Sequence, residues 1–288
     1  MKTLLALTVL LFISTLAKAE PVQFMLQDSL EPGRSLTVYI VGDREQQTKA
    51  TDALYAALDH GKRAWNSFNI GNPESELSKI NAKGKGVYTI SADLSKAITE
   101  AVTVAKWSEG RFEPVFSADS NFFVKKDFRK IALDPDTNQL TIKSDNLTID
   151  LHTMVQGLVV DIIADDLNFH HWPNSYISLN STYLARGHDA NGPWKISVED
   201  QSAGDAKRMI YFKATDLASA TFTGLGTQNK SDLKAVTIFT QSAAQAAAFS
   251  GVIYSMGLKE GSAFLKSLPY LTSILVDAQG QFHKIPDK

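Results

Sequence analysis

A passage from strand to helix lies in the middle of the chain and reads Ile149-Asp-Leu-His-Thr-Met-Val-Gln-Gly-Leu-Val-Val-Asp161. Residues 147–151 form an apolar, β-branched run that predicts a strand, and a helix is expected over residues 154–168. Another strand is predicted over residues 139–143. The Ser-Asp-Asn sequence at residues 144–146 then predicts a hairpin between these two strands.

Outward from this passage, strands are grouped and helices stand apart. Helices or helical turns are predicted over residues 46–66, 75–81, 92–108, 243–256 and 260–267, and strands over residues 35–41, 175–179, 194–198, 209–213, 235–240 and 272–276. This grouping favours an α+β fold of antiparallel sheets packed by helices over a strictly alternating one. No low-complexity linker interrupts the chain after residue 19, so residues 20–288 are predicted to form a single domain.

The first nineteen residues have the pattern of a secretory signal peptide. Lys2 is followed by an apolar run over residues 4–16, and Ala17-Lys18-Ala19 forms a cleavage site of the small-x-small type. The apolar run is shorter than the roughly 20 residues that a spanning helix needs, so export with cleavage is expected rather than a membrane anchor. The chain has no cysteine. Lipid attachment after cleavage is therefore excluded, and stability must come from packing without disulfides.

Composition excludes several classes of function. The 288 residues carry 29 Lys and Arg against 31 Asp and Glu, a formal charge of -2, so nothing in the charge balance favours a nucleic acid as partner. The chain lacks a phosphate-binding Gly-Lys-Ser/Thr loop, a Gly-x-Ser-x-Gly nucleophile elbow and a His-Glu-x-x-His zinc motif. The tandem His170 and His171 are interpreted as loop imidazoles rather than metal ligands.

Six segments occur in a recognisable order along the chain: Ser75-Glu-Leu-Ser-Lys-Ile-Asn81, Gly110-Arg-Phe-Glu-Pro114, the passage over residues 149–161, Trp194-Lys-Ile-Ser-Val198, the turn Thr223-Gly224, and the strand and helix over residues 235–257. In this order they resemble the ApbE family of periplasmic flavin transferases. The resemblance implies an α+β fold of the T-fold type. It also implies binding of FAD with Mg²⁺, cleavage of the FAD pyrophosphate, and transfer of FMN to a threonine of a partner redox protein. Together with the signal peptide it implies a periplasmic location.

Seven positions align with positions of the family's motifs and are the predicted cofactor-binding residues: Glu76, Asp150, Gln156, Gly157, Asp161, Thr223 and Gly224. Plainer roles remain open for three of them. Asp150 and Asp161 could be a surface aspartate and a helix cap, and Glu76 could cap the backbone of Ser78 and Lys79. No catalytic residue is assigned.

Several positions, including one of these seven, depart from the family's pattern. Gln156 replaces a lysine, His152 replaces a glycine, Asn180-Ser181 replaces a Gly-Gly turn, and the loop that should follow Thr223-Gly224 is missing. Ala247 and Gly251 stand where the family has its Asp and Thr metal ligands, and neither offers the oxygen donor that Mg²⁺ requires. No metal ligand is therefore predicted. An Mg²⁺ site would need different side chains, such as Asp189 or Asp232, to converge there.

Three functions stay open on these grounds. We expect a divergent family member with weakened or absent catalysis that binds flavin or a partner, either a periplasmic redox protein or an active transferase. The alternatives are an active Mg²⁺-dependent FMN transferase and an unrelated small-molecule binding protein on the same scaffold. Four aromatic residues fall near the expected flavin cleft, although aromatics at such spacings are more often core: Phe222, Phe249, Tyr183 and Trp194.

Overall fold

The structure is a computed structural model that describes residues 20–117, 127–199, 209–224 and 231–286. The predicted signal peptide over residues 1–19 lies outside the described residues, and so do residues 225–230, which follow the Thr223-Gly224 turn. Among the described residues no helix has both the length and the apolar character needed to cross a membrane.

The helices are α1 (Gln47–Phe68), α2 (Glu76–Lys83), α3 (Ala92–Trp107), α4 (Val155–Phe169) and α5 (Ala243–Lys266), with short 3₁₀ turns at Arg44–Gln46 and Phe128–Lys130. The strands are β1 (Val22–Ser29), β2 (Ser35–Gly42), β3 (Gly86–Thr89), β4 (Val115–Ser117), β5 (Ile131–Asp134), β6 (Gln139–Ile142), β7 (Leu147–Ile149), β8 (Ser175–Leu179), β9 (Thr182–Arg186), β10 (Trp194–Glu199), β11 (Met209–Ala214), β12 (Leu217–Thr223), β13 (Leu233–Thr240), β14 (Thr272–Asp277) and β15 (Phe282–Ile285).

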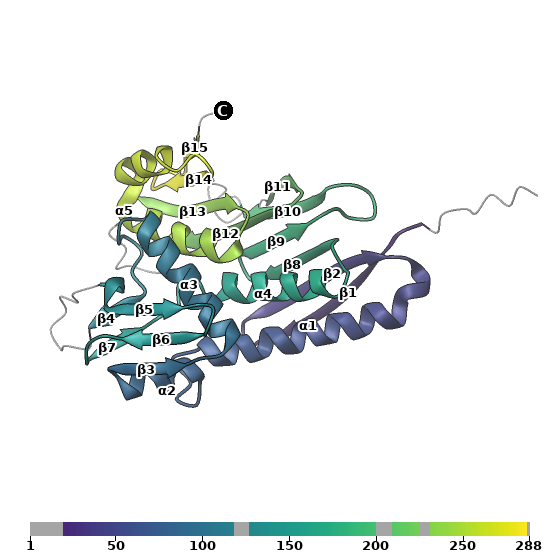
Figure 1. Ribbon diagram of the computed structural model, residues 1–288. Helices are drawn as coiled ribbons and strands as arrows, with labels where there is room; N and C mark the ends of the chain where they lie inside the picture. The colour runs from purple at the N-terminus through teal and green to yellow at the C-terminus, as the bar shows by residue number, and fades with distance from the viewer. Residues whose placement is uncertain (1–19, 118–126, 200–208, 225–230, 287–288) are drawn as a thin grey trace, which may run out of the picture.

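A large antiparallel sheet organises the described part of the chain. Its strands run in the order β1-β2-β8-β9-β12-β13-β14-β15, so its central strands come from distant parts of the sequence (Figure 1). Helices α1, α4 and α5 pack on one another, and together they contact this sheet along its length. Smaller antiparallel sheets, β3-β6-β5 and β4-β7, lie near α2 and α3.

Each face of the large sheet contributes side chains to an apolar cluster. Leu36, Val38 and Ile40 of β2 belong to the main core together with the helices. On the opposite face of the sheet, Tyr176 and Phe239 belong to a second apolar cluster, which is covered by the β10-β11 hairpin. The alternation of side chains along β2 and β8 therefore separates two cores.

The predicted α+β class is confirmed, but one predicted pairing is wrong. The strands over residues 139–143 and 147–151 were expected to form a hairpin, whereas β6 pairs with β3 and β5, and β7 pairs with β4. Both edges of β6 are already occupied, so the turn at Asn146, whose φ is 59°, sends the chain to another sheet. A local turn signal predicts a reversal but does not choose the partner strand.

The predicted helices lie close to the observed ones, and the break at Gly257 is also present. Gly257 interrupts α5 with a φ of 74°, and the backbone N–H of Leu258 donates to Asp232 Oδ1 at 2.7 Å. The patterns missed β1, β3, β4, β5, β9, β12 and β15, most of which are short or rich in small and polar residues. Trp194 and Tyr183 lie in the cluster beneath β10-β11, and Phe249 is fully buried in the main core, so these three aromatics are core residues.

Candidate functional site

A cavity of about 200 Å³ opens where α5, β12, the end of β7 and the segment before β4 meet. Asp150 and Thr153 line it from the passage between β7 and α4, and Phe222 lines it from β12. Gly251 belongs to the wall formed by α5, whose other lining residues are Ala248, Val252 and Ser255. The rest of the lining comes from the segment after α3 and from β4, and consists of Arg111, Phe112, Glu113 and Phe116.

The position of Asp150 follows from a short network around the end of β7. Asn81 of α2 accepts from the backbone N–H of Ile149 at 2.9 Å and donates to its carbonyl at 2.8 Å, which fixes the strand end. The N–H of Asp150 donates to the carbonyl of Pro114 at 2.8 Å. Asp150 Oδ1 then accepts from the N–H of His152 at 2.7 Å, a turn that leads into α4. Asp150 is therefore held at the cavity wall by backbone contacts.

Glu113 supports the part of the lining that precedes β4. Its side chain is buried and accepts hydrogen bonds from the N–H groups of Val115 at 3.0 Å and Phe128 at 3.1 Å. Burial of a carboxylate is tolerated where backbone donors replace water. Glu113 therefore ties the segment before β4 to the turn before β5.

The wall formed by α5 offers little polarity to the cavity. A Cβ added at Gly251 would lie 3.0 Å from Thr153 Cγ2 and 3.8 Å from the Phe222 ring, so this backbone faces both residues directly. The Ser255 hydroxyl donates to the carbonyl of Val252 at 2.7 Å. Phe222 itself is 38% exposed, and its ring centroid lies 4.9 Å from that of Tyr254. The cavity thus combines the carboxylate residues Asp150 and Glu113 with an aromatic and aliphatic wall.

Comparison with known proteins shows which family this architecture belongs to. The model of the ApbE family matches residues 33–223, which is more than half of the chain. The chain belongs to the ApbE family. A curated relative, an FAD:protein FMN transferase of Chlamydia pneumoniae, is 30% identical over 153 residues. The match covers 46% of this chain and 48% of the relative, so the chain spans about half the length of that relative.

Solved structures of ApbE proteins have the same fold. The flavin transferase ApbE of Vibrio cholerae superposes with a TM-score of 0.73 at 16% identity, over 92% of this chain and 96% of that one. The apo form of the Pseudomonas stutzeri flavinyl transferase ApbE gives a TM-score of 0.75 at 14% identity, over 92% and 95%. The ApbE protein of Thermotoga maritima gives 0.72 at 19% identity, over 91% and 97%.

Two of the predicted site residues hold the ApbE scaffold together. Gly157 lies where α4 meets the start of α5, and a Cβ there would be 2.2 Å from the carbonyl oxygen of Ala243. Asp161, one turn further along, accepts from Ser242 Oγ at 2.8 Å and from the N–H groups of Ala243 at 2.9 Å and Ala244 at 3.0 Å. Asp161 therefore caps α5. Burial raises the pKa of its carboxyl to about 6, although these hydrogen bonds oppose the shift.

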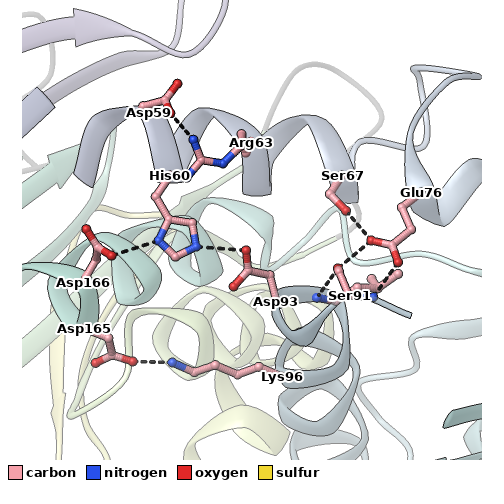
Figure 2. A network of polar contacts seen from close by, with 11 residues as sticks. Asp59, His60, Arg63, Ser67, Glu76, Ser91, Asp93, Lys96, Asp165 and Asp166 are labelled. Carbon is pink, nitrogen blue, oxygen red and sulfur yellow. Dashed lines mark hydrogen bonds and ion pairs between the residues drawn. The ribbon is translucent and has the colours of Figure 1, made fainter. Parts of the chain in front are cut away.

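Glu76 also makes contacts within the protein, as Figure 2 shows. Its carboxylate accepts from Ser67 Oγ at 2.9 Å, and from the N–H and Oγ of Ser91 at 2.7 Å and 2.6 Å. It thereby joins the end of α1 to the start of α3. The cap on Ser78 comes from Ser75 Oγ instead, at 3.0 Å.

The same view contains a histidine between two carboxylates. His60 of α1 lies 2.9 Å from Asp93 of α3 through Nε2, and 3.2 Å from Asp166 of α4 through Nδ1 (Figure 2). The two carboxylates lie at opposite nitrogens of one ring and do not converge on a shared point. This contact joins three helices away from the cavity beside Asp150.

Of the remaining predicted residues, Asp150 is the one that lines the cavity. Gln156 is half-buried in the first turn of α4, and its Oε1 is buried without a hydrogen-bond partner. Thr223 ends β12, and the N–H of Gly224 donates to the carbonyl of Lys234 at 3.3 Å. Motif matching missed Thr153, whose position beside Gly251 depends on how α4 and α5 pack.

The donor set does not fit Mg²⁺. Within the described residues no group of three or more His, Asp or Glu side chains is placed to hold a metal ion. Ala248 and Gly251 contribute no side-chain oxygen to the cavity. Asp232 accepts from Leu258 at the break in α5, and Asp189 accepts from the N–H of Ala190, so neither converges on this wall.

Proposed function

We propose that this protein is an exported member of the ApbE family that binds flavin beside Asp150 without performing Mg²⁺-dependent FMN transfer. The observation that carries the proposal is the α5 wall of the cavity. There Gly251 occupies a position that the family resemblance assigns to an oxygen ligand, and its neighbours on the cavity are Ala248 and Val252. Mg²⁺ demands near-octahedral oxygen coordination, and within the described residues no group of three or more His, Asp or Glu side chains is placed to supply it.

The cavity fits part of a flavin. Its volume of about 200 Å³ falls below the ~300 Å³ at which sites that enclose a whole small-molecule ligand begin. The exposed ring of Phe222 would contact the flat face of an isoalloxazine. Arg111, whose guanidinium already pairs with Glu109 at 3.0 Å, lies at the same cavity and would attract phosphate. A flavin would therefore be held at its ring and only partly enclosed.

This proposal gives the protein a role in flavoprotein maturation outside the cytoplasm. The family match supports flavin as the ligand class, and the curated relative carries the name FAD:protein FMN transferase. The signal-peptide pattern over residues 1–19 supports export to the periplasm with cleavage before Glu20. If a mass measurement showed that the exported protein retains residues 1–19, cleavage would be refuted.

Flavin fluorescence tests the binding step. Titration of FAD and FMN with the purified protein should quench flavin emission equally with and without Mg²⁺. Phe222→Ala should weaken binding about five- to tenfold, because an aromatic contact is worth about 1 kcal/mol. Tyr211→Ala is the matched control, since Tyr211 is an exposed aromatic on β11. Equal loss in both variants, or no quenching by the wild type, would contradict flavin binding at this cavity.

A transfer assay tests the catalytic step. The protein is incubated with FAD, Mg²⁺ and a threonine-bearing acceptor, with an active family member as positive control. We expect an unchanged acceptor mass. An FMN adduct on the acceptor would establish the active-transferase alternative. Recovery of a redox protein or another transferase from a periplasmic pull-down, without flavin quenching, would favour partner binding instead.

A further inference from the structure

A second cavity, of about 190 Å³, lies away from the flavin-site candidate, at the junction of α3, α4, the end of β9 and the start of α5. Its polar lining consists chiefly of Lys96, Glu100, Asp161, Asp165, Arg186 and Gln245. Leu158 and Ile162 of α4 form an apolar part of the wall. This mixture of opposite charges around a hollow differs from the aromatic wall of the first cavity.

Most charges at this cavity already have partners in the protein. Asp161 is occupied by the three donors at the start of α5. Lys96 and Asp165 form an ion pair between α3 and α4, drawn in Figure 2. The ion pair neutralises Lys96 with Asp165, and the three donors at the start of α5 satisfy the carboxylate of Asp161.

One anion and one cation at this cavity have no partner among the described residues. The Oε1 atom of Glu100 is buried without a hydrogen-bond partner. Arg186 is half-buried, and its guanidinium makes no hydrogen bond or ion pair with any residue that the structure describes. Buried polar groups in folded proteins are almost always hydrogen-bonded, and leaving one such as Glu100 Oε1 unpaired is costly. Together with the solvent-accessible cation of Arg186 on the same cavity, it indicates a ligand that carries both complementary charges.

We propose that this cavity binds a small zwitterion of the α-amino-acid class. The ligand carboxylate contacts Arg186, whose planar guanidinium pairs with carboxylates through two parallel hydrogen bonds. The ligand ammonium donates to Glu100 Oε1, and the amide of Gln245 lies on the same wall. A water molecule takes up ~30 Å³ of liquid, so the cavity holds about six non-hydrogen atoms, the size of alanine or serine.

Isothermal titration calorimetry with L-alanine and L-serine as probes tests the proposal on the full mature chain. Both should bind, with Kd values between about 1 µM and 1 mM. Acetate and methylamine each carry one of the two charges and should bind at least about tenfold more weakly than L-alanine. No heat and no shift in melting temperature with either amino acid up to about 10 mM would overturn the proposal.

Paired variants locate the site. Arg186→Gln and Glu100→Gln should each weaken L-alanine binding at least about tenfold, because each removes a charge-assisted hydrogen bond. Arg44→Gln, an exposed position in the turn before α1, is the control and should bind like the wild type. Unchanged affinity in both cavity variants, with circular dichroism showing that they are folded, would refute the assignment.

A direct contact between Glu100 and Arg186 is the competing explanation, since a change of rotamer could bring the two together. A double-mutant cycle in chemical unfolding without ligand distinguishes the two. The proposal expects the two substitutions to be additive, because the groups do not contact each other in the free protein. Strong coupling between them without added ligand would mean that they satisfy one another, and would overturn the proposal.

Discussion

Replacement of Gly157 by alanine should destabilise the protein strongly, because the new Cβ has no room. It would lie 2.2 Å from the carbonyl oxygen of Ala243, 2.3 Å from its carbonyl carbon and 2.5 Å from the Cα of Ala244. All three are backbone atoms of the start of α5, so no side-chain rotation relieves the contact. Ordinary contact distances require α4 and α5 to separate by roughly 1 Å.

The magnitude follows from three contributions. Overpacking a core costs about 1–3 kcal/mol, and backbone obstruction places this case at the upper end. Separation of the helices also stretches the hydrogen bonds from Ala243 and Ala244 to the buried Asp161, a further loss of about 1–2 kcal/mol. The better helix propensity of alanine returns about 1 kcal/mol. The free energy of unfolding should therefore fall by about 3 kcal/mol.

Thermal unfolding followed by circular dichroism measures this loss. At about 2–4 °C per kcal/mol, Gly157→Ala should lower the melting temperature by about 6–12 °C. Gly251→Ala is the matched control, because its Cβ would crowd only the methyl of the exposed Thr153, at 3.0 Å, which can rotate away, and would lie at an ordinary contact distance of 3.8 Å from the Phe222 ring. That variant should melt at or slightly above the wild-type temperature. Gly157→Ala melting within about 2 °C of the wild type would refute the close contact between α4 and α5.

Three further substitutions test contacts between helices. Because burial raises the pKa of Asp161 to about 6, folding takes up a proton between about pH 4 and 6. As pH rises through this window, the free energy of unfolding of the wild type should fall by about 3 kcal/mol relative to that of Asp161→Asn, and it should stay level above the window. Urea unfolding measures both proteins, and a difference between them that does not change with pH would contradict this prediction. Glu76→Ala should lower stability by about 1–2 kcal/mol and leave flavin quenching unchanged, so a selective loss of quenching would restore Glu76 as a ligand contact. His60→Phe should cost about 1 kcal/mol, since two partly exposed carboxylates lose their partner, and equal urea midpoints for variant and wild type would show that the contact contributes nothing.

Local patterns predicted the helices well because each has a long apolar period and clear ends. Residues 92–108 were expected to be helical, and α3 runs over Ala92–Trp107 with Ser91 capping its start. The pairing of the strands was harder to predict from local patterns. The central strand β12 reads Leu-Ala-Ser-Ala-Thr-Phe-Thr and has a weak strand signal, yet it lies between β9 and β13. Its place depends on partners that are distant in the sequence.

The candidate site was predictable only in part, for the same reason. Motif matching found Asp150 and placed Gly251 at the family's metal-ligand position, and both lie on one cavity. It also grouped Glu76, Gly157 and Asp161 with the cofactor-binding residues, whereas the structure shows contacts of each within the protein. A motif records which residues recur together and does not distinguish contact with a ligand from contact with another helix.

The sequence by itself determined the α+β class, the approximate course of the helices, and the absence of a side-chain oxygen at Ala247 and Gly251, because these depend on residue type and local periodicity. Only the tertiary structure decided that Gly157 and Asp161 serve the junction with α5, and that Glu100 and Arg186 line a common cavity. The physical reason is that these contacts join residues far apart in the chain, so their geometry arises from the packing of whole helices against the sheet.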